Sequence, residues 1–349
     1  MAAVPPKRFD DVVYFNAADH EWPIGFNLLT HSPHDARPRQ ADGIIECFRH
    51  LFSDSWGPRL EYLFKATLLT LLANQNVSLL GVARLLSDPV YRYWAQQRIT
   101  DPQLRFFWGR EFDRYGDRFE REAVSPIQNK VGPLLLDPVL RNIVGQVTSG
   151  FDLRFMMDRR RILVANLAKG AIGSTNANLL GSLLLTQLQL TAMQRRHRRT
   201  PFFVFVDEFG SLATDAFVDL LGEIRKYGIG LVLARQRLGH DRPGIDTAVL
   251  GNVGSHVAFR IGGHDAATMS REMGGPRDLS EFTELNNFQA FTRVLGDGDV
   301  MRLCEMSLHD PFELKRRKVS RLKKLSRQRF GTRRSVVEDR IERWFQNPF

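Results

Sequence analysis

The sequence predicts an α/β protein in which a doubly wound, mainly parallel sheet carries an inserted all-α domain. Strand and helix patterns alternate beyond residue 160, whereas residues 40–150 contain amphipathic helices and no credible strand. One short strand candidate precedes this helical block. The 349 residues suffice for about two domains. We expect a residual strand of the sheet, the all-α domain, the main part of the sheet and a basic tail at 1–25, 26–150, 151–310 and 311–349.

Cysteine usage and hydropathy favour a cytoplasmic protein. Cys47 and Cys304 lie far apart and have no metal-ligand partners at a recognised spacing, which suits a reducing compartment. No secretory apolar segment opens the chain. The longest apolar runs are interrupted by Lys65 or by Gln187 and Gln189, and none reaches about 18 residues. We therefore predict no transmembrane segment.

The elements before residue 150 follow from short-range patterns. Val12–Phe15 is a strand candidate too short to be stable alone, so it must pair with a sheet supplied elsewhere. Left unpaired, its edge would make the chain prone to aggregate. A helical stripe follows at Ile44, Ile45, Phe48, Leu51 and Phe52. Helix start signals stand at Ser78, at Asp101 with Pro102, and at Ser125 with Pro126.

Beyond residue 160, strands and helices alternate as they do in doubly wound sheets. The expected strands are Arg161–Leu167, Phe202–Val206, Ile229–Ala234 and His256–Ile261. The expected helices are Asn176–Arg196, Ala216–Lys226 and Asp265–Met273. The five consecutive apolar residues of Phe202–Val206 predict a central strand that is covered on both faces.

Two carboxylates, Asp207 and Glu208, directly follow the Phe202–Val206 strand. Open α/β sheets keep their chemistry in the crevice beyond the carboxyl ends of the strands. An apolar strand that ends in two acids is typical of the Walker B element of a nucleoside triphosphatase. There the first carboxylate holds Mg²⁺ through water, and the second orients and deprotonates the attacking water. The alternative is an apolar strand that ends in two solvated acids.

Two further polar residues flank the next strand. Gln236 ends that strand, where an amide can contact both a γ-phosphate and the attacking water. Its alternative role is that of a solvated turn residue. Arg225 precedes the strand and could reach the phosphate of a neighbouring subunit as an arginine finger. Alternatively, Arg225 is a cation that complements the dipole at a helix C-terminus.

Several segments carry a family resemblance through their order and spacing. They are D-D-V-V-Y-F-N-A-A-D-H-E-W-P-I-G-F-N-L-L, R-I-L-V-A-N-L-A-K-G-A-I-G-S-T-N-A-N-L-L, F-V-F-V-D-E-F, E-I-R-K-Y-G-I-G-L-V-L-A-R-Q and G-N-V-G-S-H-V-A-F-R-I-G-G-H-D-A. Together they resemble the ATPase domain of type IV secretion coupling proteins, the TraD/TraG class, within the HerA/FtsK group of hexameric P-loop DNA motors. The resemblance covers about residues 9 to 303. It implies a RecA-like sheet, incomplete at its N-terminus, that binds ATP and Mg²⁺.

The same resemblance implies residue roles. Asp207 and Glu208 would be the Walker B pair, with Asp207 holding Mg²⁺ through water and Glu208 catalytic. Gln236 would be the γ-phosphate sensor. Arg225 would be the trans-acting finger, ahead of Lys226 for that role.

One motif of that family is absent. The phosphate-binding loop, or Walker A motif, is G-x-x-x-x-G-K-[S/T], whereas G-A-I-G-S-T-N-A lacks a lysine after its second glycine and Lys169 precedes its glycine. The loop's lysine and amides make charge-assisted bonds worth about 1.5–3 kcal/mol each. Losing about four of them costs roughly 6–12 kcal/mol, at least about four orders of magnitude in affinity. We expect this chain alone not to bind ATP usefully.

Two functions follow from the resemblance. The first is a conjugative coupling ATPase that drives DNA translocation in a type IV secretion system, here in a truncated or split form that needs Walker A from elsewhere. The alternative is a non-hydrolysing interaction or DNA-binding subunit that docks on a motor ring, so enzymatic activity is left open. The implied partners are DNA, copies of the chain in a hexameric ring or a separate Walker A-bearing chain, and components of the secretion system or relaxosome.

The positive charge is concentrated at the C-terminal end. Residues 313–349 hold thirteen Lys or Arg and four Asp or Glu, a net charge of +9 against +10 for the whole chain. A solvated extension is one interpretation. A short amphipathic helix that docks on the body or at the periphery of the inner membrane is another, given Val319, Leu322 and Leu325. We favour a basic arm that binds nucleic acid through Lys315, Arg316, Arg317, Lys318, Arg321, Lys323 and Lys324.

Overall fold

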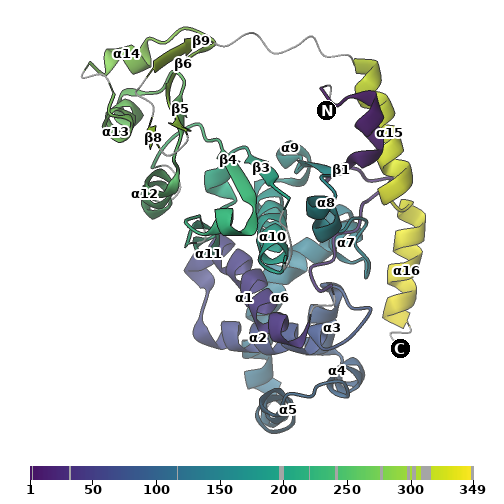
Figure 1. Cartoon of the computed structure of the whole chain (residues 1–349). Helices are drawn as coiled ribbons and strands as arrows, with labels where there is room; N and C mark the ends of the chain where they lie inside the picture. Colours follow the sequence, from purple (N-terminus) through teal and green to yellow (C-terminus); the bar gives the residue numbers. More distant parts are fainter. Residues whose placement is uncertain are drawn as a thin grey trace. The chain divides into compact units, whose positions relative to one another are not determined.

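The protein has an α/β fold and forms two compact units. Unit 1 comprises Met1–Phe202 with Arg316–Phe349, and unit 2 comprises Phe203–Lys315. Figure 1 shows the elements of both. The structure, a computed structural model, describes residues 1–346 except 2, 31–32, 116, 196–199, 220, 240–242, 276–277, 297–298, 301–303 and 308–315. Among these residues, no helix has the length and apolar character needed to cross a membrane.

Unit 1 is mainly helical, as the sequence predicts for residues 40–150. Its helices are α1 (Arg37–Leu51), α2 (Pro58–Leu72), α3 (Leu80–Ser87), α4 (Pro89–Gln96), α5 (Pro102–Phe106), α6 (Asp117–Leu136), α7 (Pro138–Val144), α8 (Leu153–Asp158), α9 (Lys169–Ile172), α10 (Ser174–Met193), α15 (Arg316–Phe330) and α16 (Arg334–Gln346). Helix α1 packs on both α2 and α10, and the described part of residues 40–150 contains no strand.

Local sequence signals explain some helix starts and not others. Asp101 Oδ1 accepts a backbone N–H of α5 at 2.8 Å, and Pro102 is the first helical residue, so this predicted start is confirmed. Ser78 is not a cap, because α3 begins two residues later without a side-chain hydrogen bond. Pro126 lies inside α6 instead of at its start. Buried apolar residues on both sides of this proline continue the helix, and such packing outweighs local preference.

The N-terminal strand finds its partner within unit 1. β1 (Val12–Asn16) pairs in parallel with β2 (Ile162–Asn166), with Val12 opposite Ile162. The expectation that the edge of this strand is left unpaired is therefore wrong. A strand about 150 residues further along the chain supplies the hydrogen bonds.

Helix α15 covers the other edge of β1 (Figure 1). Leu322 is 1% exposed and packs in one apolar cluster with Phe9 and Val12. The backbone N–H of Tyr14 donates to Ser326 Oγ at 2.7 Å. A side-chain hydroxyl of α15 thus satisfies a strand N–H that a neighbouring strand would otherwise bind.

Helix α16 continues along unit 1. Val337 and Ile341 are buried, and α16 packs on α7. Arg84 donates to Trp344 O at 2.6 Å, and the Trp344 and Tyr91 ring centroids are 5.6 Å apart. Residues 316–346 are therefore folded against unit 1, as the amphipathic-helix alternative expects, and are not a solvated extension.

The strands and helices between residues 202 and 307 belong to unit 2, apart from Phe202, the first residue of β3, which is counted with unit 1. They are β3 (Phe202–Val206), α11 (Asp215–Asp219), β4 (Ile229–Leu233), α12 (Pro243–Asn252), β5 (His256–Ala258), α13 (Gly263–Met273), α14 (Ser280–Thr283), β6 (Gln289–Arg293), β7 (Leu295–Gly296), β8 (Asp299–Val300) and β9 (Cys304–Ser307). The predicted helix Ala216–Lys226 is interrupted. It ends with α11, and a 3-10 helix, η7 (Ile224–Tyr227), follows beyond Gly222.

The described strands form several small sheets, so one large doubly wound sheet is not seen. Unit 2 holds the pair β3–β4, the three-stranded sheet β5–β6–β9 and the pair β7–β8. The expected parallel strand His256–Ile261 is shorter and runs antiparallel to β6. β3 is not covered on both faces either, because Phe203 and Phe205 are 65% and 75% exposed.

Candidate active site at the end of β3

The two acids that follow β3 lie in a turn fixed by backbone hydrogen bonds. Ala234 N donates to Val206 O at 2.9 Å, and Phe209 N donates to Ala234 O at 3.0 Å. These bonds join the carboxyl end of β3 to that of β4, so the two strands run in the same direction. Asp207 and Glu208 are the residues held between the two bonds.

The turn keeps Glu208 in an unusual backbone conformation. Its φ of 53° and ψ of 46° are left-handed, a region that residues with side chains rarely adopt. Its N–H donates to Asp207 Oδ1 at 3.1 Å, and Ser211 Oγ donates to Glu208 O at 3.1 Å. Strain of this kind persists where the surrounding contacts hold it, and it recurs at functional sites.

The carboxylates of the turn offer oxygen ligands that suit a magnesium ion. Asp207 is exposed and Glu208 half-buried, and neither has an ion-pair partner within the described part of the chain. Mg²⁺ retains several waters and commonly uses only one or two carboxylates. The described residues contain no group of three or more His, Cys, Asp and Glu close enough to bind a metal. An exposed carboxylate such as that of Asp207 suits a water-mediated contact with this ion.

Gln236 lies at the same end of the strand pair as the two acids. It is exposed and stands two residues beyond Ala234, whose backbone bonds flank the acidic turn. The structure therefore brings the predicted sensor to the strand end that carries Asp207 and Glu208.

Two acids that the sequence analysis does not identify fix the loop after β4. Asp246 pairs with Arg235 and accepts the Gly239 N–H. Asp265 accepts the Leu238 N–H at 3.1 Å. These contacts stand on both sides of the predicted sensor and anchor its loop. Asp246 and Asp265 lie in the first turns of α12 and α13, where the helix dipole favours acids. An acid at the start of each predicted helix was therefore the only sequence feature that pointed to these two residues.

Arg225 lies at the opposite end of β4. It belongs to η7, is exposed and has no side-chain partner among the described residues. The five residues of β4 span about 16 Å, so Arg225 is not brought to the acids of its own chain. Lys226 forms a surface ion pair with Glu223 at 3.1 Å.

The glycine-containing segment after β2 does not form a phosphate-binding loop. Lys169 is exposed in the four-residue helix α9, and Gly173, with φ of 82°, precedes α10. The residues of this segment therefore form the helix α9 and the start of the helix α10, and they do not wrap around an anion. The described residues fit a magnesium contact, but they do not supply the cradle that the phosphates of ATP need.

The basic residues predicted to bind nucleic acid have different surroundings. Lys323 Nζ lies 5.1 Å from the centroid of the Tyr14 ring, a cation–π contact that joins α15 to β1. Arg321 and Lys324 are exposed, Lys318 is half-buried, and none of the three has a charged partner in the region the structure describes. The remaining three are Arg316 and Arg317, the first residues of α15, and Lys315, which lies outside the described residues.

The α/β fold of this chain is similar to that of bacterial conjugative coupling proteins. Several structures of TrwB are among the similar solved structures. TrwBdeltaN70 in complex with sulphate is 12% identical, with a TM-score of 0.58, and the match covers 88% of this chain and 76% of that one. TrwB bound to the GTP analogue GDPNP is 14% identical with a TM-score of 0.57, and TrwB bound to ADP and Mg²⁺ is 13% identical with a TM-score of 0.58, at the same coverages. No protein-family model and no curated protein sequence matches the chain. At these identities the likeness is one of fold.

Proposed function

We propose that this chain is the Walker B-bearing part of a conjugative coupling ATPase with a RecA-like core. The observation that carries the proposal is the hydrogen-bonded turn at Asp207 and Glu208, which shares its strand end with Gln236. The fold of TrwB, a conjugative coupling protein solved with ADP and Mg²⁺, supports the same class. The proposed activity is ATP-driven translocation of DNA in a type IV secretion system.

In this proposal each residue has one task. Asp207 holds Mg²⁺ through a water, and Glu208 orients and deprotonates the water that attacks the γ-phosphate. Gln236 contacts that phosphate from the anchored loop after β4. Arg225 reaches a nucleotide of the next subunit in a homo-oligomeric, hexameric ring, which agrees with its distance from the acids of its own chain.

A second polypeptide segment supplies the phosphate-binding loop. Among the described residues β4 pairs only with β3, so its other edge can accept a further strand. One face of the pair is apolar and open, because Phe203, Phe205 and Val232 are 65%, 75% and 47% exposed. A strand, glycine-rich loop and helix would bury this face and bring the missing lysine to the Asp207 end of the sheet.

The test compares the chain alone with the chain joined to such a segment. Alone, it is expected to show no ATP-dependent thermal shift and no turnover above a Glu208→Gln control. Co-produced with an upstream fragment that carries G-x-x-x-x-G-K-[S/T], it is expected to hydrolyse ATP, and Glu208→Gln is expected to abolish hydrolysis while ATP binding remains. Micromolar ATP binding by the isolated chain would contradict the proposal, because another segment would then cradle the phosphates.

The trans role of Arg225 has a separate test in that complex. Arg225→Ala is expected to lower kcat by roughly 10³. Lys226→Ala is the matched control, since its ammonium is already paired with Glu223, and it is expected to change kcat less than about twofold. A decrease in kcat of less than tenfold for Arg225→Ala would instead support the alternative in which Arg225 is a cation at a helix end.

A second candidate function is DNA binding through α15 by a subunit that does not hydrolyse ATP. The observation that favours it is the set of Lys318, Arg321 and Lys324, which make no ion pair in the described structure. Changing all three to Ala is expected to reduce the slope of log K against log salt for single-stranded DNA by about 2. An unchanged slope would show that DNA binds elsewhere on the protein.

A further inference from the structure

One buried carboxylate holds the loop after β4 at two points. Arg235, the residue before Gln236, forms an ion pair with Asp246 Oδ1, and Asp246 Oδ2 accepts the N–H of Gly239. Gly239 has a φ of 71°, in the left-handed region that glycine adopts without strain. Asp246 is 8% exposed and lies in the first turn of α12. Charge-assisted bonds of this kind are about twice as strong as neutral ones, so they tie both ends of the loop firmly to α12.

A second helix holds the middle of the same loop. The N–H of Leu238 donates to Asp265 Oδ2 at 3.1 Å, and Asp265 lies in the first turn of α13. The Leu238 side chain packs against the apolar cluster that contains Ala258 and Met269. The loop after β4 is therefore fixed by the starts of two helices and by an apolar cluster of unit 2.

Gln236 has no side-chain bond of its own in this anchored loop. The residue is exposed, and its amide has no hydrogen-bond partner in the part of the chain that the structure describes. The backbone around Gln236 is therefore fixed, whereas its amide is left to contact a ligand. Fixing the backbone beforehand matters for such a contact, because a misplacement of about 1 Å can cost about a hundredfold in rate.

We propose that Asp246 is the positioning residue of Gln236. Its carboxylate fixes residues 235 and 239, so that the amide between them meets the γ-phosphate and the attacking water in one orientation. This role rests on the proposed ATPase function, in which Gln236 is the γ-phosphate sensor. Asp246 acts through Gln236 and does not itself touch the nucleotide.

The kinetic test uses the complex of the full chain with the upstream fragment that carries G-x-x-x-x-G-K-[S/T]. Asp246→Asn is expected to lower kcat about tenfold to a hundredfold, because the sensor is no longer held in place. The KM for ATP is expected to change less than about twofold, because the glycine-rich loop holds the phosphates. In a Gln236→Ala background, Asp246→Asn is expected to lower kcat less than about twofold further. A carboxylate that only stabilises unit 2 would instead add its full loss to that of Gln236→Ala.

A second variant separates positioning from a failure to fold. Asp246→Asn also removes the carboxylate that compensates the charge of Arg235, and this can destabilise unit 2. Arg235→Met combined with Asp246→Leu removes both charges, and replacing a buried ion pair by apolar residues often preserves stability. The double variant is expected to lower kcat as much as Asp246→Asn does, because the Gly239 N–H loses its acceptor in both.

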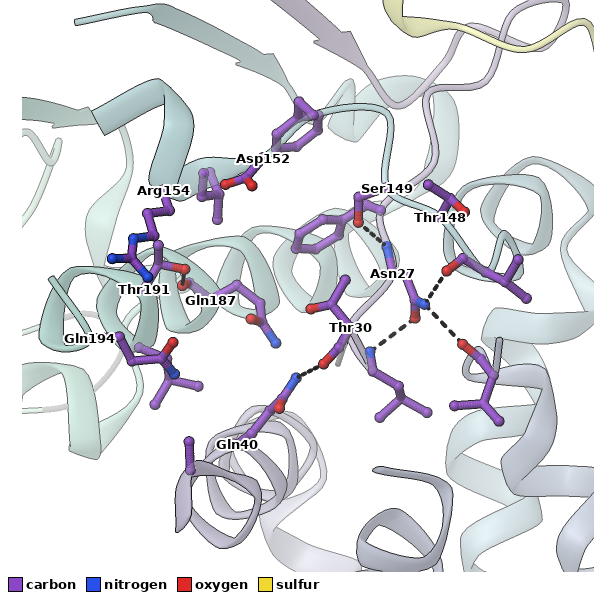
Figure 2. A pocket seen from close by; sticks show the side chains of 18 of the residues that line it. Asn27, Thr30, Gln40, Thr148, Ser149, Asp152, Arg154, Gln187, Thr191 and Gln194 are labelled. Carbon is purple, nitrogen blue, oxygen red and sulfur yellow. Dashed lines mark hydrogen bonds between the residues drawn. The ribbon is translucent and has the colours of Figure 1, made fainter. Parts of the chain in front are cut away.

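A buried amide of unit 1 provides the matched control. Asn27 is 4% exposed and lies in the wall of a cavity of about 950 Å³ (Figure 2). Its Nδ2 donates to Val77 O at 2.9 Å and to Val147 O at 2.8 Å. Its Oδ1 accepts the Leu29 N–H at 2.9 Å. Like Asp246, this side chain joins separate loops, so Asn27→Asp is expected to lower the melting temperature and to leave kcat unchanged.

Hydrogen exchange tests the anchoring without ATP hydrolysis. In the isolated chain, Asp246→Asn is expected to speed exchange of the Gly239 amide at least about tenfold, because that amide loses a charged acceptor. Unchanged exchange, unchanged kcat in both Asp246 variants, or a full additional loss in the Gln236→Ala background would overturn the positioning role and leave the ATPase proposal intact. No turnover by the unchanged complex would overturn the ATPase proposal, and the positioning role with it.

Discussion

The two parallel strand pairs of this protein, β1–β2 in unit 1 and β3–β4 in unit 2, differ in how their apolar residues are covered. In the first, Val12 and Val13 are 1% and 2% exposed, and α15 satisfies the free edge of β1 through Ser326. In the second, Phe203 and Phe205 are mostly exposed, and the Phe203 ring lies over Gly230 of β4. The chain thus completes one pair with its own C-terminal helix and leaves an apolar face open on the other.

From this difference we infer that the β3–β4 pair is the part of the molecule on which a further segment docks. An open apolar face on a strand that ends in two carboxylates, neither of them ion-paired within the described residues, is expected where another segment docks before chemistry can occur. The covered pair has no such need. Of the three predictions below, the first two test this distinction and the third concerns another sheet of unit 2; they run from the largest expected effect to the smallest.

Removing the anchor of α15 is expected to destabilise unit 1 strongly. Leu322→Ala deletes a side chain that is 1% exposed beside Phe9 and Val12, and the cavity left behind is expected to cost about 2–5 kcal/mol. Urea unfolding followed by Trp fluorescence measures this, because all five Trp lie in unit 1. The exposed neighbour Arg321 provides the control, with an expected change within about 0.5 kcal/mol for Arg321→Ala. Equal stability of the two variants would mean that α15 does not stabilise β1.

The docking of α15 also shows where sequence reasoning stops. The spacing of Val319, Leu322 and Leu325 predicted an amphipathic helix, and the helix is present. Its binding place, the edge of a strand some 300 residues earlier, depends on contacts such as that between Tyr14 and Ser326. No local pattern encodes such a contact. Deleting residues 313–349 would therefore remove part of the core of unit 1 along with the basic charges.

The strand that carries the acids shows a different limit. A continuous apolar run such as Phe202–Val206 gives the position of a strand, and the structure confirms those bounds. The apolar run does not indicate whether this chain covers both faces of the strand or whether another segment covers one of them. Gln236 likewise stands at the strand end that strand order predicts, whereas the anchoring of its loop by Asp246 and Asp265 depends on how the next two helices pack.

The open face of β3–β4 is expected to drive self-association of the isolated chain. Changing Phe203 and Phe205 together to Thr keeps a strand-favouring residue type and removes the exposed rings, so sedimentation velocity is expected to show less oligomer at the same concentration. Val206→Thr is the control on the buried face of the same strand. It is expected to destabilise unit 2 by about 1–3 kcal/mol without reducing association. If the double variant forms as much oligomer as the unchanged protein, then a surface other than the β3–β4 face drives the association.

The smallest expected effect is a pH dependence in unit 2 that rests on His256 in β5. Burial, and then the cation of Arg293 opposite it in β6, lower the pKa of His256, against a weaker opposing effect of Glu272. As the pH falls through the ordinary histidine pKa of about 6.5, the unfolded chain takes up a proton that the folded unit does not. Unit 2 therefore loses stability in that range, and the loss ends below the lowered pKa. Hydrogen exchange of β5 and β6 amides at pH 7.5 and 5.5, corrected for intrinsic rates, measures this. His256→Gln is expected to reduce the difference in β5 and β6 amide exchange between the two pH values. The same pH dependence in the variant would show that other groups control it.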